Sequence, residues 1–389
     1  MSRSRKQAAA QAEPLAQSFA DNRKRLAGMA KVTGDMGNWR PAPEVMREVQ
    51  AVPTRFVQLD AITRVSGWPI ARIGLISGPS AEGKTELLLG IGSSFLARDH
   101  FFGFLDLEMT TPPSWVSKLM GGLEKHPGFV ALPPGGTYEQ NAVQVRKFCE
   151  RIAKARKDGD LSEETTGLIG VDSIRKFMPA DLLKRLSQEV AEGGRARGKR
   201  HGIDGIGGRA AQIKAALNAA WMDELVPLLA ETRCAVIIIS REDLDPEDIY
   251  ADKPKIGGGR ALFYESSLVV RVTRHDLTEE IAGDKVSVGE RHIATIYKSK
   301  VAGRFEKRPM AAFHTSNGRL VPEGFWPERD VLEIAEECGV VELKGSHYSY
   351  GRKRLGHGKP GTLKRLHDDP ELLAELDRAV RAATRSNGA

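Results

Sequence analysis

Short apolar runs alternate with amphipathic stretches between residues 54 and 315, and this alternation is the strongest pattern in the chain. Strand-like runs that alternate with helix-like patterns are typical of a parallel sheet with helical crossovers. The pattern predicts strands over 73–77, 102–106, 167–172, 235–240 and 268–272. It predicts helices over 86–98, 140–157, 210–230 and 328–338. Two stretches interrupt it, a Gly- and Arg-rich one over 191–209 and one with Asp, Pro and Gly over 242–260.

The segments on either side of this region have a different pattern. Residues 1–53 begin with apolar positions spaced as on one face of a helix and end in a linker over 36–53; the apolar positions are Leu15, Phe19, Leu26 and Met29. An amphipathic helix without its own core packs on a neighbouring surface, within the chain or between subunits. Residues 319–389 are dense in Lys, Arg and His. We therefore expect an α/β protein with an N-terminal helical segment (1–53), a core with a mostly parallel central sheet (54–318) and a small C-terminal α/β lobe (319–389).

Composition and charge narrow the class of protein. The chain has 389 residues, of which 28% are charged and 41% hydrophobic, as is usual for a folded soluble protein. No apolar run approaches the roughly 20 residues that span a bilayer, and none follows the basic N-terminus, so we expect no membrane partner and no secretory signal. Cys149, Cys234 and Cys338 lie far apart and fit the reduced thiols of a cytoplasmic protein.

The loop after the strand predicted over 73–77 carries the clearest chemical motif. It reads Gly78, Pro79, Ser80, Ala81, Glu82, Gly83, Lys84 and Thr85, which matches G-x-x-x-x-G-K-[ST]. Because a strand precedes it and a helix follows, the backbone N–H groups of the loop and the helix N-terminus would surround a phosphate. Lys84 would reach the β- and γ-phosphates of ATP, and the Thr85 hydroxyl would bind Mg²⁺. The motif predicts that the chain binds a nucleoside triphosphate.

Carboxylates stand at the ends of two further predicted strands. Asp172 ends an apolar run as the Walker B carboxylate does, and it would hold Mg²⁺ through water. Glu108 follows the strand after the P-loop helix, where a carboxylate lies beside the γ-phosphate and can polarise the attacking water. The alternative is structural: Asp172 would cap a following helix, and Asp106 or Glu108 would cap the following turn.

The order of these motifs resembles the RecA family of strand-exchange recombinases. The matching segments run through most of the chain beyond residue 50 and are Leu59-Asp60, Gly67 to Ile73, Asp106 to Glu108, Asp172-Ser173, Gly257 to Leu262, Lys298 to Lys300, Tyr348 to Tyr350 and Leu355 to Lys359. The resemblance implies a RecA-like P-loop ATPase core in which Glu108 activates water. It also implies that Trp115 stacks on adenine and that Lys298 and Lys300 reach the γ-phosphate of a neighbouring subunit.

One departure from the family falls on the strand predicted over 235–240. The family ends this strand with Asn-Gln, and the Gln senses the γ-phosphate; here the pair is Ser240-Arg241. An arginine can still hydrogen-bond a phosphate and would add positive charge during the transfer. We therefore expect Arg241 to take part in catalysis, together with Lys84 and Glu108. The alternative is a salt bridge from Arg241 to Glu242 or Asp243.

Basic residues in two loops and in the C-terminal lobe are predicted to bind DNA, since a single strand needs a positive track along its phosphates. The first loop, near 191–209, is longer and more basic than the family's. The second, near 242–260, is acidic at first, so we expect its later basic end to bind. The predicted DNA contacts are Arg195, Arg197, Lys199, Arg200, Arg209, Lys255, Arg260, Arg352, Lys353 and Arg354.

The resemblance implies a DNA-dependent ATPase that forms a helical filament of its own copies on single-stranded DNA and promotes pairing and strand exchange with double-stranded DNA. Two alternatives stay open: a hexameric helicase or branch-migration motor on the same core, and a regulatory paralogue that uses ATP only as an assembly switch. Such a protein would act in the cytoplasm, at the bacterial nucleoid. The Ser240-Arg241 departure suggests a phage or mobile-element recombinase, which would act in the host cytoplasm.

Overall fold

The computed structural model describes residues 24, 27–29, 31, 48–191, 201–243, 255–281, 283–302, 307 and 309–386. The chain divides into two units, Met1–Val49 and Gln50–Ala389, close to the boundary expected at residue 53. In the first unit, Lys24, the segment 27–29 and Lys31 are helical. Phe19 and Leu26, which carry the expected docking face, lie outside the described residues.

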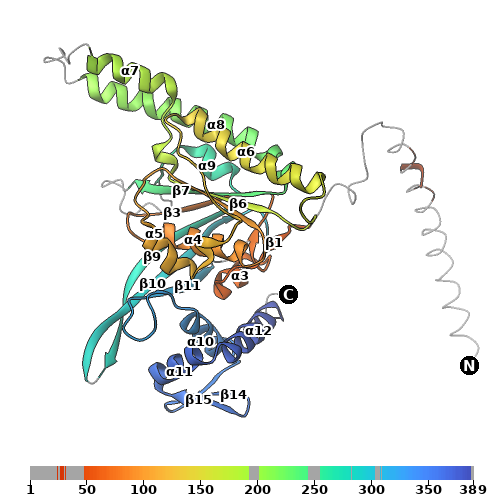
Figure 1. The fold of residues 1–389 in the computed structure, drawn as a ribbon, viewed down its shortest axis with the longest axis vertical. Coiled ribbons are helices and arrows are strands. Elements are labelled where there is room, and N and C mark those ends of the chain that lie inside the picture. Colours follow the sequence, from red (N-terminus) through yellow and green to blue (C-terminus); the bar gives the residue numbers. More distant parts are fainter. Residues whose placement is uncertain are drawn as a thin grey trace, which may run out of the picture. The chain divides into compact units, whose positions relative to one another are not determined.

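A large mixed sheet forms the centre of the second unit, with strands in the order β12-β11-β10-β9-β3-β7-β6-β4-β5 (Figure 1). The pairs from β9 to β5 are parallel, and those from β9 to β12 are antiparallel. The strands are β3 (Ile73–Gly78), β4 (Phe101–Asp106), β5 (Phe129–Ala131), β6 (Gly167–Asp172), β7 (Ala235–Asp243), β9 (Leu268–Ile281), β10 (Asp284–Ser299), β11 (Met310–Ser316) and β12 (Gly324–Phe325). The expected RecA-like α/β core with a mostly parallel sheet is confirmed.

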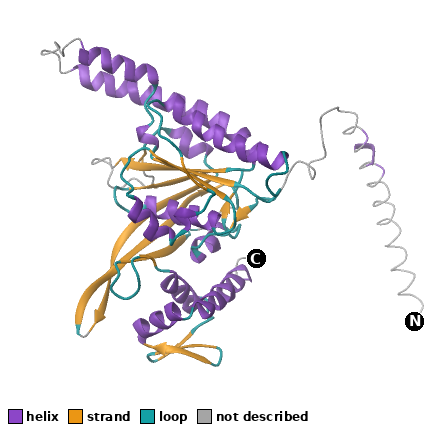
Figure 2. Cartoon of the chain, viewed as in Figure 1, coloured by secondary structure: helices purple, strands orange, loops and turns teal. Residues whose placement is uncertain are grey.

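Helices cover both faces of this sheet, which is why its inner strands are apolar along their whole length. On one face lie α3 (Val57–Thr63), α4 (Lys84–Leu96) and α5 (Pro113–Met120), and on the other α6 (Tyr138–Lys157), α8 (His201–Thr232) and α9 (Arg260–Glu265) (Figures 1 and 2). Two short pairs complete the unit: β1 (Ala51–Val52) with β2 (Trp68–Pro69), and β8 (Lys255–Ile256) on β7. Short 3₁₀ turns span Leu123–Lys125 and Ile174–Lys176.

The structure differs from the sequence-based expectation in the region 191–209. Helix α7 (Ala180–Ala191) precedes it, and residues 201–209, expected in a loop, belong to α8. Each glycine costs a helix only about 1 kcal/mol, whereas the later part of α8 buries Trp221, Met222 and Leu225 against the sheet. Because that packing fixes the helix, its first turns extend through the Gly-rich stretch.

The long β9–β10 hairpin is a second difference. The apolar run predicted only a strand over 268–272, but β9 continues to Ile281 and pairs with β10 along its length. Beyond Val272 both faces carry polar residues, so the period-2 pattern that indicates a half-buried strand is absent. The far ends of the two strands project from the sheet (Figure 1).

The C-terminal lobe is a three-stranded antiparallel sheet with helices, as expected for a small α/β lobe. Its elements are α10 (Pro327–Glu337), β13 (Glu342–Lys344), β14 (His347–Tyr350), β15 (Lys353–His357), α11 (Gly358–Asp368) and α12 (Pro370–Ser386). Its apolar core includes Trp326, Leu363 and Leu376, and it continues onto Val57 of α3 and Val288 of β10. The lobe is therefore packed on the core rather than attached by a linker alone.

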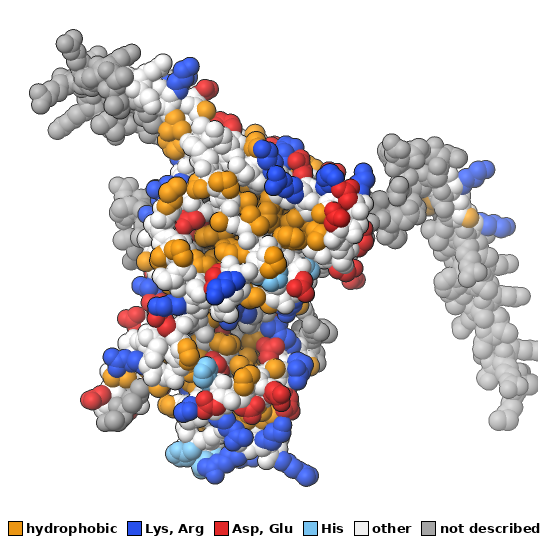
Figure 3. Space-filling view, in the orientation of Figure 1, with side chains coloured by type: hydrophobic (Ala, Val, Ile, Leu, Met, Phe, Trp, Pro, Cys, Tyr) orange, Lys and Arg blue, Asp and Glu red, His pale blue; other side chains and the backbone are white. Residues whose placement is uncertain are grey.

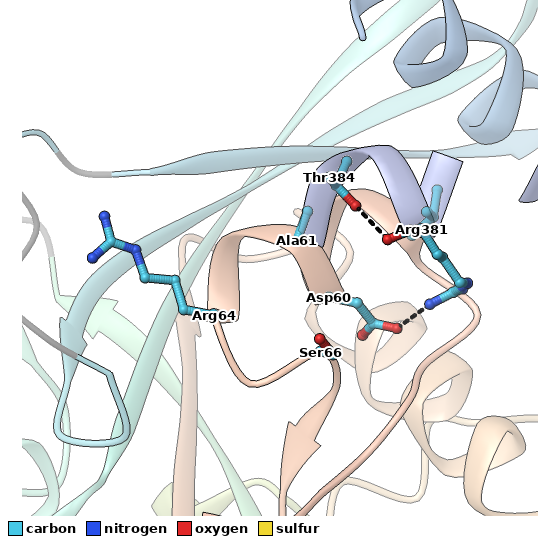
Figure 4. Close-up of a pocket in the computed structure, with 7 residues that line it drawn as sticks. Asp60, Ala61, Arg64, Ser66, Arg381 and Thr384 are labelled. Carbon is cyan, nitrogen blue, oxygen red and sulfur yellow. Dashed lines mark hydrogen bonds and ion pairs between the residues drawn. The ribbon is translucent and has the colours of Figure 1, made fainter. Parts of the chain in front are cut away.

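Buried ion pairs add to this packing. On α12, Arg381 donates through Nη1 to Asp60 Oδ2 at 2.6 Å, and Asp60 is only 4% exposed (Figure 4). The Thr54 hydroxyl and backbone N–H donate to the same carboxylate, at 2.7 and 2.8 Å. On β11, buried His314 contacts Asp330 of α10 through Nδ1 at 2.7 Å.

Candidate functional site

The loop Gly78–Thr85 lies between β3, which ends at Gly78, and α4, which begins at Lys84. This arrangement directs the first N–H groups of α4 and those of the loop toward one space, which is the geometry of an anion site. The Lys84 ammonium donates to the Pro79 carbonyl across the loop. Burial, followed by the nearby charge of Arg241, lowers the pKa of Lys84. Lys84 is thus a partly desolvated cation inside the loop.

Thr85 and Asp172 meet at the floor of this site. The Thr85 hydroxyl donates to Asp172 Oδ2 at 2.6 Å, and Asp172 is 6% exposed. Burial raises the pKa of Asp172 to about 6, with a further upward contribution from the charge of Glu108. A hydroxyl and a carboxylate are the hard oxygen ligands that Mg²⁺ prefers. The pair therefore fits Mg²⁺, with Thr85 as ligand and Asp172 close by.

Glu108 and Asp106 have different surroundings, although both follow β4. Asp106 accepts the backbone N–H groups of Met109 and Thr111 at 2.8 and 3.2 Å, so it is the residue that caps the turn. Glu108 accepts the Ser173 hydroxyl at 2.7 Å, and its carboxylate lines the cavity of the P-loop. Of the two carboxylates, Glu108 is the one placed to act on a bound molecule.

Arg241 enters the same cavity from β7, which pairs with β3 so that Arg241 lies opposite Gly78. Its backbone carbonyl accepts the Gly257 N–H at 3.1 Å, and the Ser240 hydroxyl donates to the Gly257 carbonyl at 2.7 Å. Glu242 is not the partner expected for Arg241, because its carboxylate accepts Arg271 Nε at 2.9 and 3.0 Å and the Ser77 hydroxyl at 3.1 Å. The Asp243 side chain is outside the described part of the chain.

Together these groups line a cavity of about 220 Å³. Trp115 of α5 borders it, and so does Glu86, the acidic residue in the first turn of α4. Both also line a neighbouring cavity of about 250 Å³. Sequence reasoning missed Glu86 and Ser173, although each directly follows a motif residue, and that adjacency was the available signal. The cavity can hold phosphates beside a cation, a carboxylate and an arginine, with Trp115 at its rim.

Lys298 and Lys300 lie far from this cavity. Ser299 pairs with Leu268, which pairs with Gly74, so the lysines are level with the start of β3. Gly78 is four residues further along, or about 13 Å at the usual rise of a strand. Lys298 Nζ donates to the carbonyls of Phe263 and Tyr264 at 2.6 and 2.5 Å. The two lysines are therefore not part of this chain's own P-loop cavity.

The predicted DNA contacts fall into three groups. Arg195, Arg197, Lys199 and Arg200 lie outside the described residues, as do the side chains of Arg209 and Lys255. Arg260 is exposed at the start of α9, next to a cavity of about 600 Å³ that Gly257, Gly258 and Gly259 line together with Lys214. Arg352, Lys353 and Arg354 are exposed on the β14–β15 hairpin, at the basic end of the C-terminal lobe (Figure 3).

No described helix is both long and apolar enough to cross a bilayer. Among the described residues, no group of three or more His, Cys, Asp and Glu side chains could hold a metal ion. A Mg²⁺ ion at Thr85 would thus need ligands from water and from the nucleotide.

Comparison with known proteins gives a consistent result. The sequence profile described as the RecA C-terminal domain matches residues 329–385. Protein RecA of Aquifex aeolicus is 28% identical over 336 residues, which are 86% of this chain and 84% of that protein. Protein RecA of Thermus thermophilus is 27% identical over 335 residues (86% and 85%), and that of an Arthrobacter species 25% over 357 residues (92% and 89%). These similarities, over most of the chain and at its C-terminal lobe, support a divergent member of the RecA family.

Proposed function

We propose that this chain is an ATP-dependent homologous recombinase, which forms a helical filament on single-stranded DNA and promotes pairing and strand exchange with duplex DNA. The observation that carries the proposal is the separation of two half-sites: the P-loop cavity lies at one end of β3, and Lys298 and Lys300 lie level with the other. Head-to-tail stacking of copies would bring the two lysines of one copy to the cavity of the next. A nucleotide at that contact would stabilise the assembly that it bridges.

The residues predicted for this site each have a role in the proposed hydrolysis of ATP. Lys84 and the loop amides bind the phosphates, and Trp115 stacks on the base. Glu108 takes a proton from the water whose oxygen bonds to the γ-phosphorus, while the bond from phosphorus to the ADP oxygen breaks. Arg241 and the neighbour's Lys298 and Lys300 stabilise the charge on the transferred group. Mg²⁺ at Thr85 and Asp172 would supply charge neutralisation.

The contacts of Arg241 could couple nucleotide binding to DNA binding. Its strand is tied by two hydrogen bonds to Gly257, three residues before the exposed Arg260. A change in the position of Arg241 would therefore move the segment that precedes Arg260. We propose that this segment, with Lys255 and the basic residues near 195–209, binds single-stranded DNA. Arg352, Lys353 and Arg354 of the C-terminal lobe would meet the duplex.

The place of action and the origin of the chain are part of the proposal. A recombinase with these partners would act in the cytoplasm, at the bacterial nucleoid. An arginine at position 241, where the family has Gln, supports a phage or mobile-element origin, in which case the site of action is the host cytoplasm.

The test is ATP hydrolysis with and without single-stranded DNA, combined with electron microscopy of the protein on DNA. We expect DNA to stimulate hydrolysis severalfold and continuous filaments to form. The matched control is Glu108→Gln, which should keep the filament while losing hydrolysis by about 100-fold or more. Closed rings would favour the helicase or branch-migration motor, and filaments without hydrolysis would favour the regulatory paralogue; either result contradicts the proposal.

A further inference from the structure

The β9–β10 hairpin contacts the P-loop directly. The Arg274 N–H of β9 donates to the Glu82 carboxylate, and the loop begins so close to β9 that a Cβ at Gly78 would lie 2.4 Å from the Val272 carbonyl oxygen. At the other end of the loop, a Cβ at Gly83 would lie 2.2 Å from Nδ1 of His292 on β10. The position of Gly83, which has φ +95°, is thus set by direct contact with the His292 ring.

His292 is held from three sides. Its side chain is fully buried, and its ring stacks on Phe313 with centroids 4.6 Å apart and planes 10° apart. Its Nδ1 lies 3.3 Å from the Glu82 carbonyl oxygen, and its Nε2 lies 3.3 Å from the Thr315 hydroxyl. Glu290 Oε2 is 3.5 Å from Nε2, but Arg274 also pairs with that carboxylate, at 2.8 Å. Burial lowers the pKa of His292 to about 4, so the ring is neutral at neutral pH.

These partners determine the tautomer of the neutral ring. A backbone carbonyl can only accept, so the Glu82 contact requires the proton on Nδ1. Nε2 then has a lone pair and accepts the hydroxyl proton of Thr315. The buried chain of hydrogen bonds therefore runs from Thr315 to His292 and from His292 to the P-loop.

The contact with the Glu82 carbonyl has a consequence for the phosphate site. The Glu82 carbonyl and the Gly83 N–H belong to one planar trans peptide, in which they point in opposite directions. Because His292 keeps the Glu82 carbonyl directed toward the hairpin, the Gly83 N–H points away from the hairpin. Gly83 lines the P-loop cavity. A rotation of this peptide would replace a donor by a carbonyl oxygen in the place where a phosphate must bind.

We propose that His292 is a positioning residue for nucleotide binding: it donates from Nδ1 to the Glu82 carbonyl and thereby keeps the Gly83 N–H directed at the phosphates. The proposal rests on the proposed nucleotide site in the P-loop. His292 does not touch the nucleotide, and it acts on binding rather than on the chemical step.

Two substitutions distinguish the effect of the His292 ring from the effect of its N–H donor. His292→Phe keeps the stacking on Phe313 and loses the N–H; His292→Asn places an amide N–H at the position of Nδ1 and loses the rest of the ring. The measurement is the Kd of a fluorescent ATP analogue with Mg²⁺, together with KM and kcat for hydrolysis and thermal unfolding of each variant. We expect His292→Phe to raise Kd and KM about tenfold with kcat changed less than about twofold.

His292→Asn should bind the analogue within about threefold of wild type, although the space beside Phe313 lowers its Tm. Affinity and stability would then change independently, which a merely structural role does not produce. Equal affinities for His292→Phe and wild type would overturn the proposal, and so would losses that follow Tm in both variants. If His292→Phe does not fold, Thr315→Val removes the hydroxyl that donates to Nε2 and helps to hold the ring in place, and it should raise Kd in the same direction. A wild-type protein that binds no analogue would instead contradict the proposed function.

Discussion

In the proposed Mg²⁺ site, the ionisation of Asp172 would set the pH range in which a cation can bind. Burial raises its pKa to about 6 from an ordinary value of 3.8, so the folded protein favours the protonated form. For an acid, this means that the contribution of Asp172 to stability is complete below pH 3.8 and is lost as the pH rises through about 6. Mg²⁺ requires the ionised carboxylate, so cation binding has the opposite pH dependence.

We predict that the Mg²⁺-dependent affinity for ATP falls about fivefold between pH 6 and pH 5, because Asp172, with a pKa of about 6, is about half ionised at pH 6 and only about one-tenth ionised at pH 5. The measurement is a titration with the fluorescent analogue at a series of pH values. The terminal phosphate itself titrates near pH 6, and Asp172→Asn is the control for that effect. The variant should bind more weakly at pH 7 and lose less affinity on acidification. Parallel pH profiles for the two proteins would contradict the assignment.

At the scale of elements, the ion pair between Asp60 of α3 and Arg381 of α12 is the clearest interaction that holds the C-terminal lobe on the core. Asp60 and Arg381 border a cavity of about 140 Å³ (Figure 4). Asp60 keeps a pKa raised to about 6 by burial, even though Arg381 and Thr54 favour its ionised form. Removal of Arg381 would leave a buried carboxylate without its counter-charge, which costs far more than loss of a surface pair.

We predict that Arg381→Ala lowers the free energy of unfolding by about 3 kcal/mol, the lower end of the range for buried pairs, because the arginine side chain is 20% exposed. Chemical denaturation would measure the change. Lys353→Ala is the matched control, since its pair with Glu375 is exposed on both sides and its loss should leave the free energy of unfolding nearly unchanged. Equal effects of the two substitutions would show that the packing of the lobe on the core does not depend on Asp60 and Arg381.

The elements also show what the sequence could predict. The strands at β3, β4, β6 and β7 were found to within a few residues, because strands covered on both faces are apolar throughout. The P-loop motif likewise predicted the position of the cavity. The outer part of the β9–β10 hairpin was missed because polar residues lie on both faces of β9 beyond Val272. His292 was missed because its importance comes from a contact with Glu82, 210 residues away in the chain, for which no local pattern exists.

At the scale of the whole molecule, the distribution of charges fits a protein that works as an assembly. Lys298 and Lys300 lie side by side, and burial followed by the charge of Lys300 lowers the pKa of Lys298 to about 8. The two ammonium groups repel each other, and Glu265, 3.9 Å from Lys300 Nζ, offsets part of that repulsion. A neighbour's nucleotide would supply the opposite charge and raise the pKa of Lys298 again. The proposed filament contact would therefore add negative charge beside two lysines that a single copy balances only in part, through the Glu265 carboxylate.

The most direct test of this account mixes two inactive variants, Glu108→Gln and Lys298→Ala, in equal amounts on single-stranded DNA. In a filament of either variant alone, every shared site lacks Glu108 or Lys298. Random mixing of the two variants combines an intact Glu108 with an intact Lys298 at about a quarter of the shared sites. The account predicts that hydrolysis of ATP in the mixture rises to about a quarter of the wild-type rate. A mixture no more active than the mean of the two variants would contradict the claim that the site is shared between subunits.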